Sequence, residues 1–176
     1  MNVYRLGKTT ILFSEKSGRS SLVIVPKGMK DLVVADKAAS VFGMAQLHAR
    51  SDGHETPYSK GMTMIGSMTA ASMRFAGRET KENSITTVLT GAHGLWWTQT
   101  LTACGRALVC HTKIKNTGDA PVTLDHAASF CLAGMTPFEA GTTPDCMRLH
   151  RFSSFWSCEG RHECQTIEEL NMETSW

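Results

Sequence analysis

Short apolar segments separated by turn residues constrain the fold of this chain more than any other feature. Leu95–Ala103 and Ala107–Lys115 flank the sequence Cys-Gly-Arg at 104–106, and a short Gly-containing connection between two such runs is typical of a β-hairpin. The sequence Asn-Thr-Gly-Asp at 116–119 predicts a second turn. We therefore expect a meander of three antiparallel strands, the third beginning near Pro121.

Apolar and polar residues alternate along this expected third strand, as in a strand with one buried face. The apolar positions are Val122, Leu124, Ala128, Phe130 and Leu132, with His126 among them, while Thr123, Asp125 and Ser129 face the other way. This pattern predicts that His126 is a core or rim histidine rather than a ligand.

Further strands are expected at both ends of the chain. Thr9–Phe13, Leu22–Val25 and Asp31–Ala35 are short runs bounded by turn residues, and Arg148–Ser157 is followed by a turn and a return strand at His162–Ile167. Aromatic residues on both faces of Arg148–Ser157 predict cover on both sides. The sequence predicts an all-β fold, an antiparallel β-sandwich, and its 176 residues suffice for a single domain with a core.

Composition excludes several classes of protein. A hydrophobic fraction of 41% with 19% charged residues argues against disorder. Lys and Arg, 18 against 16 Asp and Glu, are scattered, which argues against a nucleic-acid partner. The longest apolar stretch, Leu22–Val25, is far shorter than the about 20 residues of a membrane helix. Residues 1–8 lack the pattern of a secretory signal, so we expect a cytoplasmic protein with reduced cysteines.

The motifs that could carry chemistry give weak signals. Cys158, His162 and Cys164 form a cluster, with His150 on the preceding strand, but zinc sites usually use paired Cys-x2-4-Cys knuckles. We expect no metal and no cofactor, and a pair of incidental thiols facing each other across the hairpin. Neither a nucleophile elbow nor a phosphate-binding loop occurs.

Two neighbouring segments, one aromatic and one polar, are candidates for contact with a ligand. Trp96 and Trp97 alternate faces of a strand, so at most one is positioned to stack on a sugar ring, and core packing is the favoured interpretation. Arg50–Gly61 is polar and predicts a long surface loop, a kind of segment that often carries function.

Residues 149–161 read Leu-His-Arg-Phe-Ser-Ser-Phe-Trp-Ser-Cys-Glu-Gly-Arg, an aromatic strand followed by a Glu-Gly-Arg turn. This stretch, together with Asn-Thr-Gly-Asp-Ala-Pro-Val-Thr-Leu at 116–124, resembles glycoside hydrolase family 36, the α-galactosidases. With the closing residues 170–176, the similarity covers essentially the whole chain. It implies an incomplete amino-terminal β-supersandwich, which in that family precedes a catalytic (β/α)8 barrel.

The resemblance also implies where chemistry lies. The family hydrolyses terminal α-galactosides with retention, through a covalent glycosyl-aspartate, and its nucleophile lies in a Lys-x-Asp-x-Asn type motif on a barrel strand. This sequence has no such motif, so we expect no catalytic residue here and no activity of the chain alone. The implied partners are the rest of the polypeptide or a neighbouring subunit in a homo-oligomer, and the α-galactoside bound by the full enzyme.

The long polar loop is the place where the resemblance points to substrate. Relatives often carry an Asp-x-Arg type element there that reaches towards a sugar. Asp52 matches the aspartate, while His54 and Glu55 stand where arginine is expected. Asp52 and His54 are therefore the candidate substrate-binding residues. The alternative interpretation of the whole chain is a stand-alone carbohydrate-binding or scaffolding β-sandwich.

Overall fold

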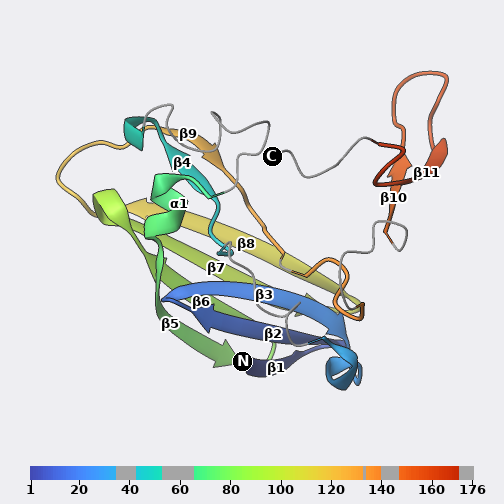
Figure 1. Cartoon of the computed structure of the whole chain (residues 1–176), viewed down its shortest axis with the longest axis horizontal. Helices are drawn as coiled ribbons and strands as arrows, with labels where there is room; N and C mark the ends of the chain where they lie inside the picture. The colour runs from blue at the N-terminus through green and yellow to red at the C-terminus, as the bar shows by residue number, and fades with distance from the viewer. Residues whose placement is uncertain (35–42, 53–65, 133, 140–146, 171–176) are drawn as a thin grey trace.

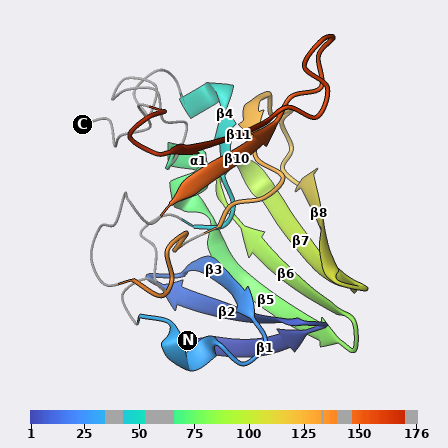
Figure 2. The same ribbon diagram turned by 90° about the vertical axis from the view of Figure 1, so that its right-hand side faces the viewer.

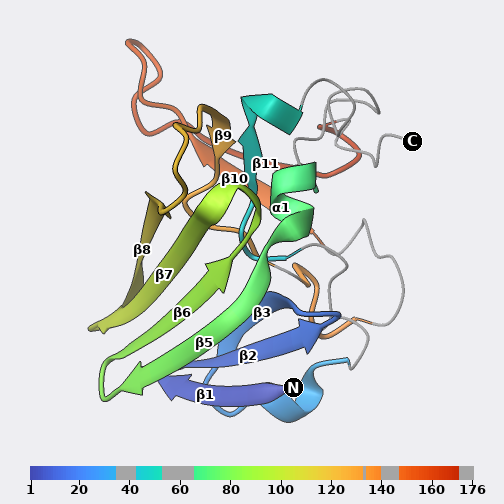
Figure 3. The same cartoon turned by 90° about the vertical axis from the view of Figure 1, so that its left-hand side faces the viewer.

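The computed structural model describes residues 1–34, 43–52, 66–132, 134–139 and 147–170 (Figure 1). Over these residues the chain consists mainly of antiparallel β-sheet, which confirms the all-β prediction. Two larger sheets face each other as in a β-sandwich, without closing into a continuous barrel (Figure 3). Within the described ranges, no helix is both long and apolar enough to cross a bilayer.

The first sheet has three strands in the order β1-β2-β3: β1 (Asn2–Leu6), β2 (Thr9–Lys16) and β3 (Arg19–Pro26). The strands expected near Thr9 and Leu22 are thus confirmed, whereas β1 was not predicted. β2 and β3 are joined through Ser17 and Gly18, which have φ angles of 53° and 76°. Positive φ at both central residues is the requirement of the tight hairpin turns that match strand twist.

The second sheet has four strands in the order β5-β6-β7-β8 (Figure 2). They are β5 (Arg74–Lys81), β6 (Ser84–Thr90), β7 (Leu95–Cys104) and β8 (Ala107–Asn116). The hairpin expected around 104–106 is confirmed as β7–β8, with full pairing from Leu95 and Asn116 to the turn. β5 and β6 were not predicted.

The core lies between the two sheets. Buried side chains from the first sheet meet buried side chains from the second in one cluster, which also takes in residues near β4; its members include Leu6, Ile11, Phe13, Leu22, Leu47, Ile85, Leu89, Trp97 and Leu101. Fully buried positions alternate with less buried ones along β6 and β7, so every second residue of these strands faces the interior.

The expected meander is wrong in its third strand. β9 (Leu124–Ala127) pairs with β4 (Leu47–Ala49), not with β8. Residues 117–123, which join β8 to β9, exceed the length of a tight hairpin loop, and Arg50 N donates to Thr123 O at 2.9 Å. The predicted face is correct as far as Ala128, since 122, 124, 126 and 128 are all partly buried.

Two shorter elements complete the amino-terminal half, and the first of them corrects a prediction. The segment expected as strand Asp31–Ala35 begins instead as a 3-10 helix, η1 (Lys30–Leu32), with Ala35 outside the described residues. Its backbone bonds are local, Leu32 N to Met29 O and Val33 N to Lys30 O, and Leu32 is 63% exposed. Asp31 and Leu32 are exposed and offer no buried face to a sheet, whereas Val33 packs against the cluster of Leu12, Val23 and Val25. Helix α1 (Met68–Ser72) contacts β4, and Thr69 Oγ1 accepts from Ala49 N at 3.2 Å.

The carboxy-terminal strands form a separate hairpin that projects from the body (Figure 1). β10 (Arg148–Phe152) pairs with β11 (His162–Thr166). The strand predicted to reach Ser157 ends at Phe152, and every residue of β10 is exposed. The prediction of cover on both sides is therefore wrong, because no sheet packs against either face within the described chain.

Candidate functional site

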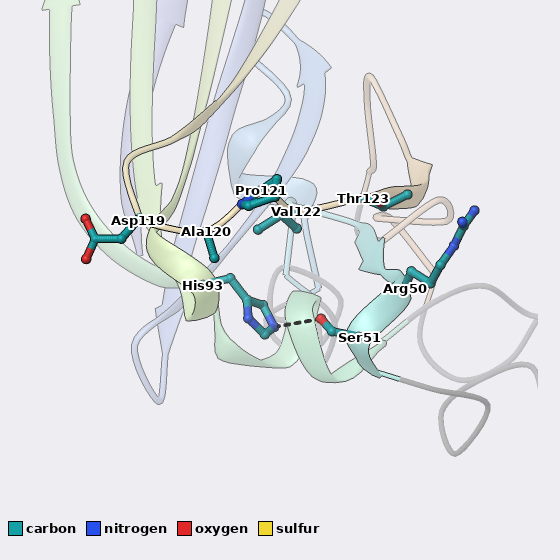
Figure 4. Close-up of a pocket in the computed structure, with 9 residues that line it drawn as sticks. Arg50, Ser51, His93, Asp119, Ala120, Pro121, Val122 and Thr123 are labelled. Carbon is teal, nitrogen blue, oxygen red and sulfur yellow. Dashed lines mark hydrogen bonds between the residues drawn. The ribbon is translucent and has the colours of Figure 1, made fainter.

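A pocket of about 570 Å³ lies where β7 begins and β8 ends (Figure 4). Three segments form it: the 3-10 helix η3 (Arg50–Asp52) after β4, the turn η5 (Ala92–Gly94) before β7, and the connection from β8 to β9. Its lining residues are Arg50, Ser51, His93, Gly118, Asp119, Ala120, Pro121, Val122 and Thr123.

Ser51 and His93 bridge two of these segments. Ser51 Oγ lies 3.3 Å from His93 Nε2 (Figure 4). His93 has a φ of 59°, a left-handed conformation that is uncommon for a residue with a side chain and in which histidine is enriched. The turn thus holds the imidazole at the pocket, beside the hydroxyl.

Close contact between two glycine backbones shapes the adjoining wall. A Cβ built on Gly94 would lie 2.5 Å from Gly118 N, and one on Gly118 would lie 2.8 Å from His93 O. Thr117 donates to Gly94 O from its backbone N at 2.9 Å and its side chain at 2.8 Å. Only glycine allows the η5 turn and the 118–123 connection to approach this closely.

Arg50 provides a cation at the rim. Its Nε and Nη2 donate to Asp125 Oδ1 at 3.0 and 2.8 Å. These hydrogen bonds are the larger cause that raises the pKa of Arg50, and the electrostatic attraction of the Asp125 carboxylate is the second. The guanidinium therefore stays charged. Asp125 Oδ2 also lies 4.0 Å from Nδ1 of the buried His48.

The remaining wall is apolar, formed by Ala120, Pro121 and Val122. In Figure 4 the Asp119 carboxylate points away from the Ser51–His93 pair. The pocket thus combines one apolar wall, the polar side chains of Ser51 and His93, and a cation already bound to a carboxylate. Such a set of groups suits a small polar molecule with one apolar face.

The predicted site residues have different outcomes. Asp52 is the last residue of η3, so its backbone follows directly on the pocket residue Ser51; His54 lies outside the described residues. Their role in sugar contact stays a prediction. Sequence reasoning missed Ser51, His93 and 118–123, although the Gly-containing turns at 91–94 and 116–119 mark two of the three segments.

The tryptophan pair behaves as the strand alternation predicts. Trp97 is 0% exposed and belongs to the core, whereas Trp96 is 45% exposed on the opposite face of β7. Trp96 is therefore the member of the pair that is available for contact with a ligand.

The cysteine and histidine cluster forms a different contact from the one expected. Cys164 lies opposite His150 in the hairpin register, not opposite Cys158, and both cysteines are free thiols. His150 Nδ1 is 2.8 Å from His162 Nε2, and His150 Nε2 is 3.7 Å from Cys164 Sγ. Among the residues that the structure describes, no group of three such side chains is placed to hold a metal ion.

Two cysteines inside the body are poor candidates for thiolate chemistry. Burial raises the pKa of the Cys110 thiol, an effect partly offset by its hydrogen bond with Thr112, and burial also raises the pKa of Cys131. Both thiols are therefore protonated near neutral pH, and the thiolate is the reactive form.

In comparisons with known proteins, the chain matches no protein-family model, no curated protein and no solved structure.

Proposed function

We propose that this chain is the amino-terminal, non-catalytic β-sandwich part of an α-galactosidase-like retaining glycoside hydrolase, where it supports the catalytic barrel and the subunit contacts. The observation that carries the proposal is the aromatic arm, which we define as residues 148–166. Phe152, Phe155 and Trp156 are 70%, 65% and 90% exposed on it. The family resemblance is concentrated in the same residues, and exposed apolar patches of this kind mark protein interaction sites.

The arm is organised for contact with protein. The rings of His150, His162 and Phe152 stack in succession, with centroids 5.1 and 4.9 Å apart, and Arg151 pairs with Glu163 at 3.1 Å. Aromatic side chains dominate the energetics of buried interfaces. The arm therefore supports an assembly in which another part of the enzyme covers it.

The isolated chain is expected to self-associate through the arm, because its aromatic rings have no other cover. Static light scattering over a concentration series measures this. The triple variant Phe152→Ser, Phe155→Ser, Trp156→Ser is expected to raise the dissociation constant by roughly 30-fold or more, since truncating an interface anchor costs about 2 kcal/mol. Trp96→Ser, on the sheet, is the matched control and should leave association unchanged. A wild-type chain that stays monomeric at every concentration would contradict a covering role for the arm.

Activity and gene structure test the hydrolase part of the proposal. Incubation of the purified chain with an aryl α-galactoside is expected to release no phenol. Sequencing of the coding DNA beyond the Trp176 codon is expected to show an open frame that encodes a Lys-x-Asp-x-Asn motif. Heat-labile turnover that copurifies with the chain would refute a non-catalytic role, and a stop codon would refute a linked barrel.

A stand-alone carbohydrate-binding β-sandwich is the second candidate, and the pocket favours it. The Ser51–His93 pair beside the Pro121–Val122 wall offers a pyranose hydrogen-bonding groups and an apolar surface. Titration with galactose, followed by tryptophan fluorescence, is expected to saturate in the millimolar range, where ΔG is about −4 kcal/mol. His93→Asn, which tolerates the left-handed backbone, should abolish saturation, while His111→Asn on β8 should not. No fluorescence change at millimolar galactose would eliminate this candidate.

A further inference from the structure

The outer face of the four-stranded sheet carries a row of hydroxyl groups. By the outer face we mean the side of β5–β8 that is turned away from the core. On β6 and β7 its members are Ser84, Thr86, Val88, Thr90, Trp96, Thr98, Thr100 and Thr102, because the residues between them are buried. Thr86 and Thr100 are cross-strand partners, and their Oγ1 atoms lie 3.0 Å apart. The centre of the face is therefore polar and uncharged.

Exposed basic residues line one edge of this face. His111, Lys113 and Lys115 alternate along β8 with partly buried residues, opposite Thr100, Thr98 and Trp96 on β7. Neighbouring members of this basic row are about 7 Å apart, since a strand advances about 3.4 Å per residue. Among the residues described, neither Lys113 nor Lys115 has an ion-pair partner. At the opposite edge, Glu79 is bound to Lys81 at 3.4 Å.

We infer that the outer face binds an acidic polysaccharide, a chain of sugars that bears carboxylate or sulfate groups. The lysines of the basic row would meet the anionic groups, and the threonine hydroxyls would exchange hydrogen bonds with the sugar hydroxyls. Trp96, 45% exposed and opposite Lys115, offers a flat apolar surface to the ring of one sugar. The inference is independent of the α-galactosidase proposal and of the pocket.

The same face is poorly suited to the other partners that a basic surface attracts. Single-stranded nucleic acid binds by stacking successive bases on several aromatic rings, and the described residues of β6, β7 and β8 on this face include one aromatic ring other than histidine, Trp96. Protein interfaces need a buried core enriched in aromatic residues, whereas hydroxyl groups occupy the centre here. Charge complementarity therefore selects a hydroxylated polyanion.

Affinity electrophoresis of the full chain tests the inference, with polygalacturonate and dextran sulfate as acidic probes and dextran as the neutral probe. Both acidic probes are expected to retard the chain, and dextran is not. The double variant Lys113→Gln, Lys115→Gln should weaken retardation by roughly tenfold at low salt, as should Trp96→Ala, and binding should fall steeply as salt rises.

A second double variant, Lys8→Gln, Lys27→Gln, is the matched control, because it removes the same charge from exposed positions outside the outer face. It should change retardation by less than about twofold if only distant charge is lost. Thermal unfolding of all variants confirms that the fold is retained. Equal loss in both double variants would overturn the inference, as would equal retardation by dextran. Tighter binding to poly(dT) than to either acidic probe would assign the face to nucleic acid instead.

Discussion

Replacement of Arg78 by alanine is expected to lower the free energy of unfolding by about 3–5 kcal/mol, because it removes the buried cation of an ion pair, its hydrogen bonds and the packing of its stem. The Arg78 side chain is 3% exposed and lies between the two sheets. It donates to Glu15 Oε1 at 2.7 Å, to Ser20 Oγ at 3.0 Å and to Thr87 Oγ1 at 3.0 Å. Its guanidinium also lies 3.5 Å from the centroid of the Phe13 ring.

Urea denaturation followed by tryptophan fluorescence measures this loss. Arg151→Ala is the matched control, since Arg151 forms an exposed ion pair with Glu163 and such pairs contribute about 0–1 kcal/mol. The double variant Arg78→Met, Glu15→Leu should recover most of the stability, because apolar residues often replace a buried pair without cost. If Arg78→Ala costs no more than Arg151→Ala, then the buried pair does not hold the sheets together.

Truncation of Trp97 to alanine is expected to lower the free energy of unfolding by about 3–5 kcal/mol. Trp97 is 0% exposed in the cluster that joins both sheets, so its removal leaves a cavity that the surrounding strands cannot fill. Trp97→Phe should cost much less, since Nε1 of Trp97 is buried without a hydrogen-bond partner among the described atoms and phenylalanine keeps most of the apolar contact.

Trp96→Ala supplies the control for this second prediction. The two residues are adjacent and of the same type, but Trp96 is 45% exposed on the outer face, so its truncation loses less buried apolar area and should cost clearly less than that of Trp97. Chemical unfolding of the three variants gives the comparison. Equal destabilisation by Trp96→Ala and Trp97→Ala would mean that the face assignment of β7 is wrong.

The strands that could be predicted are those specified by local pattern and local turns. β2–β3, β7–β8 and β10–β11 are hairpins in which the turn residues and the apolar runs lie within one short stretch of sequence. β5 was missed because its sequence, rich in charge, shows no apolar alternation. Six of its eight residues are exposed, and the Arg78 side chain is buried by pairing with Glu15. No local signal reports a buried ion pair whose partner lies on another sheet.

The local sequence pattern also could not predict that β9 pairs with β4. The alternation in 122–128 identified the buried face correctly, but periodicity says which side of a strand is buried and not which strand lies beside it. Aromatic residues in 148–157 were expected to be covered, and the tertiary structure leaves them exposed on the arm. That exposure supports an interaction surface on the arm.

In the candidate site, too, some features follow from local sequence and others only from tertiary contacts. The sequence alone determined an all-β chain, the alternation of Trp96 and Trp97, and the polar segment that contains Asp52, because each depends on residues close together in the chain. Only the tertiary structure decided that Ser51 meets His93, that Gly94 touches Gly118, and that the basic row borders the threonines of the outer face. These contacts join segments that non-local strand pairing brings together. The sequence around any one of these residues does not indicate which distant residue it contacts.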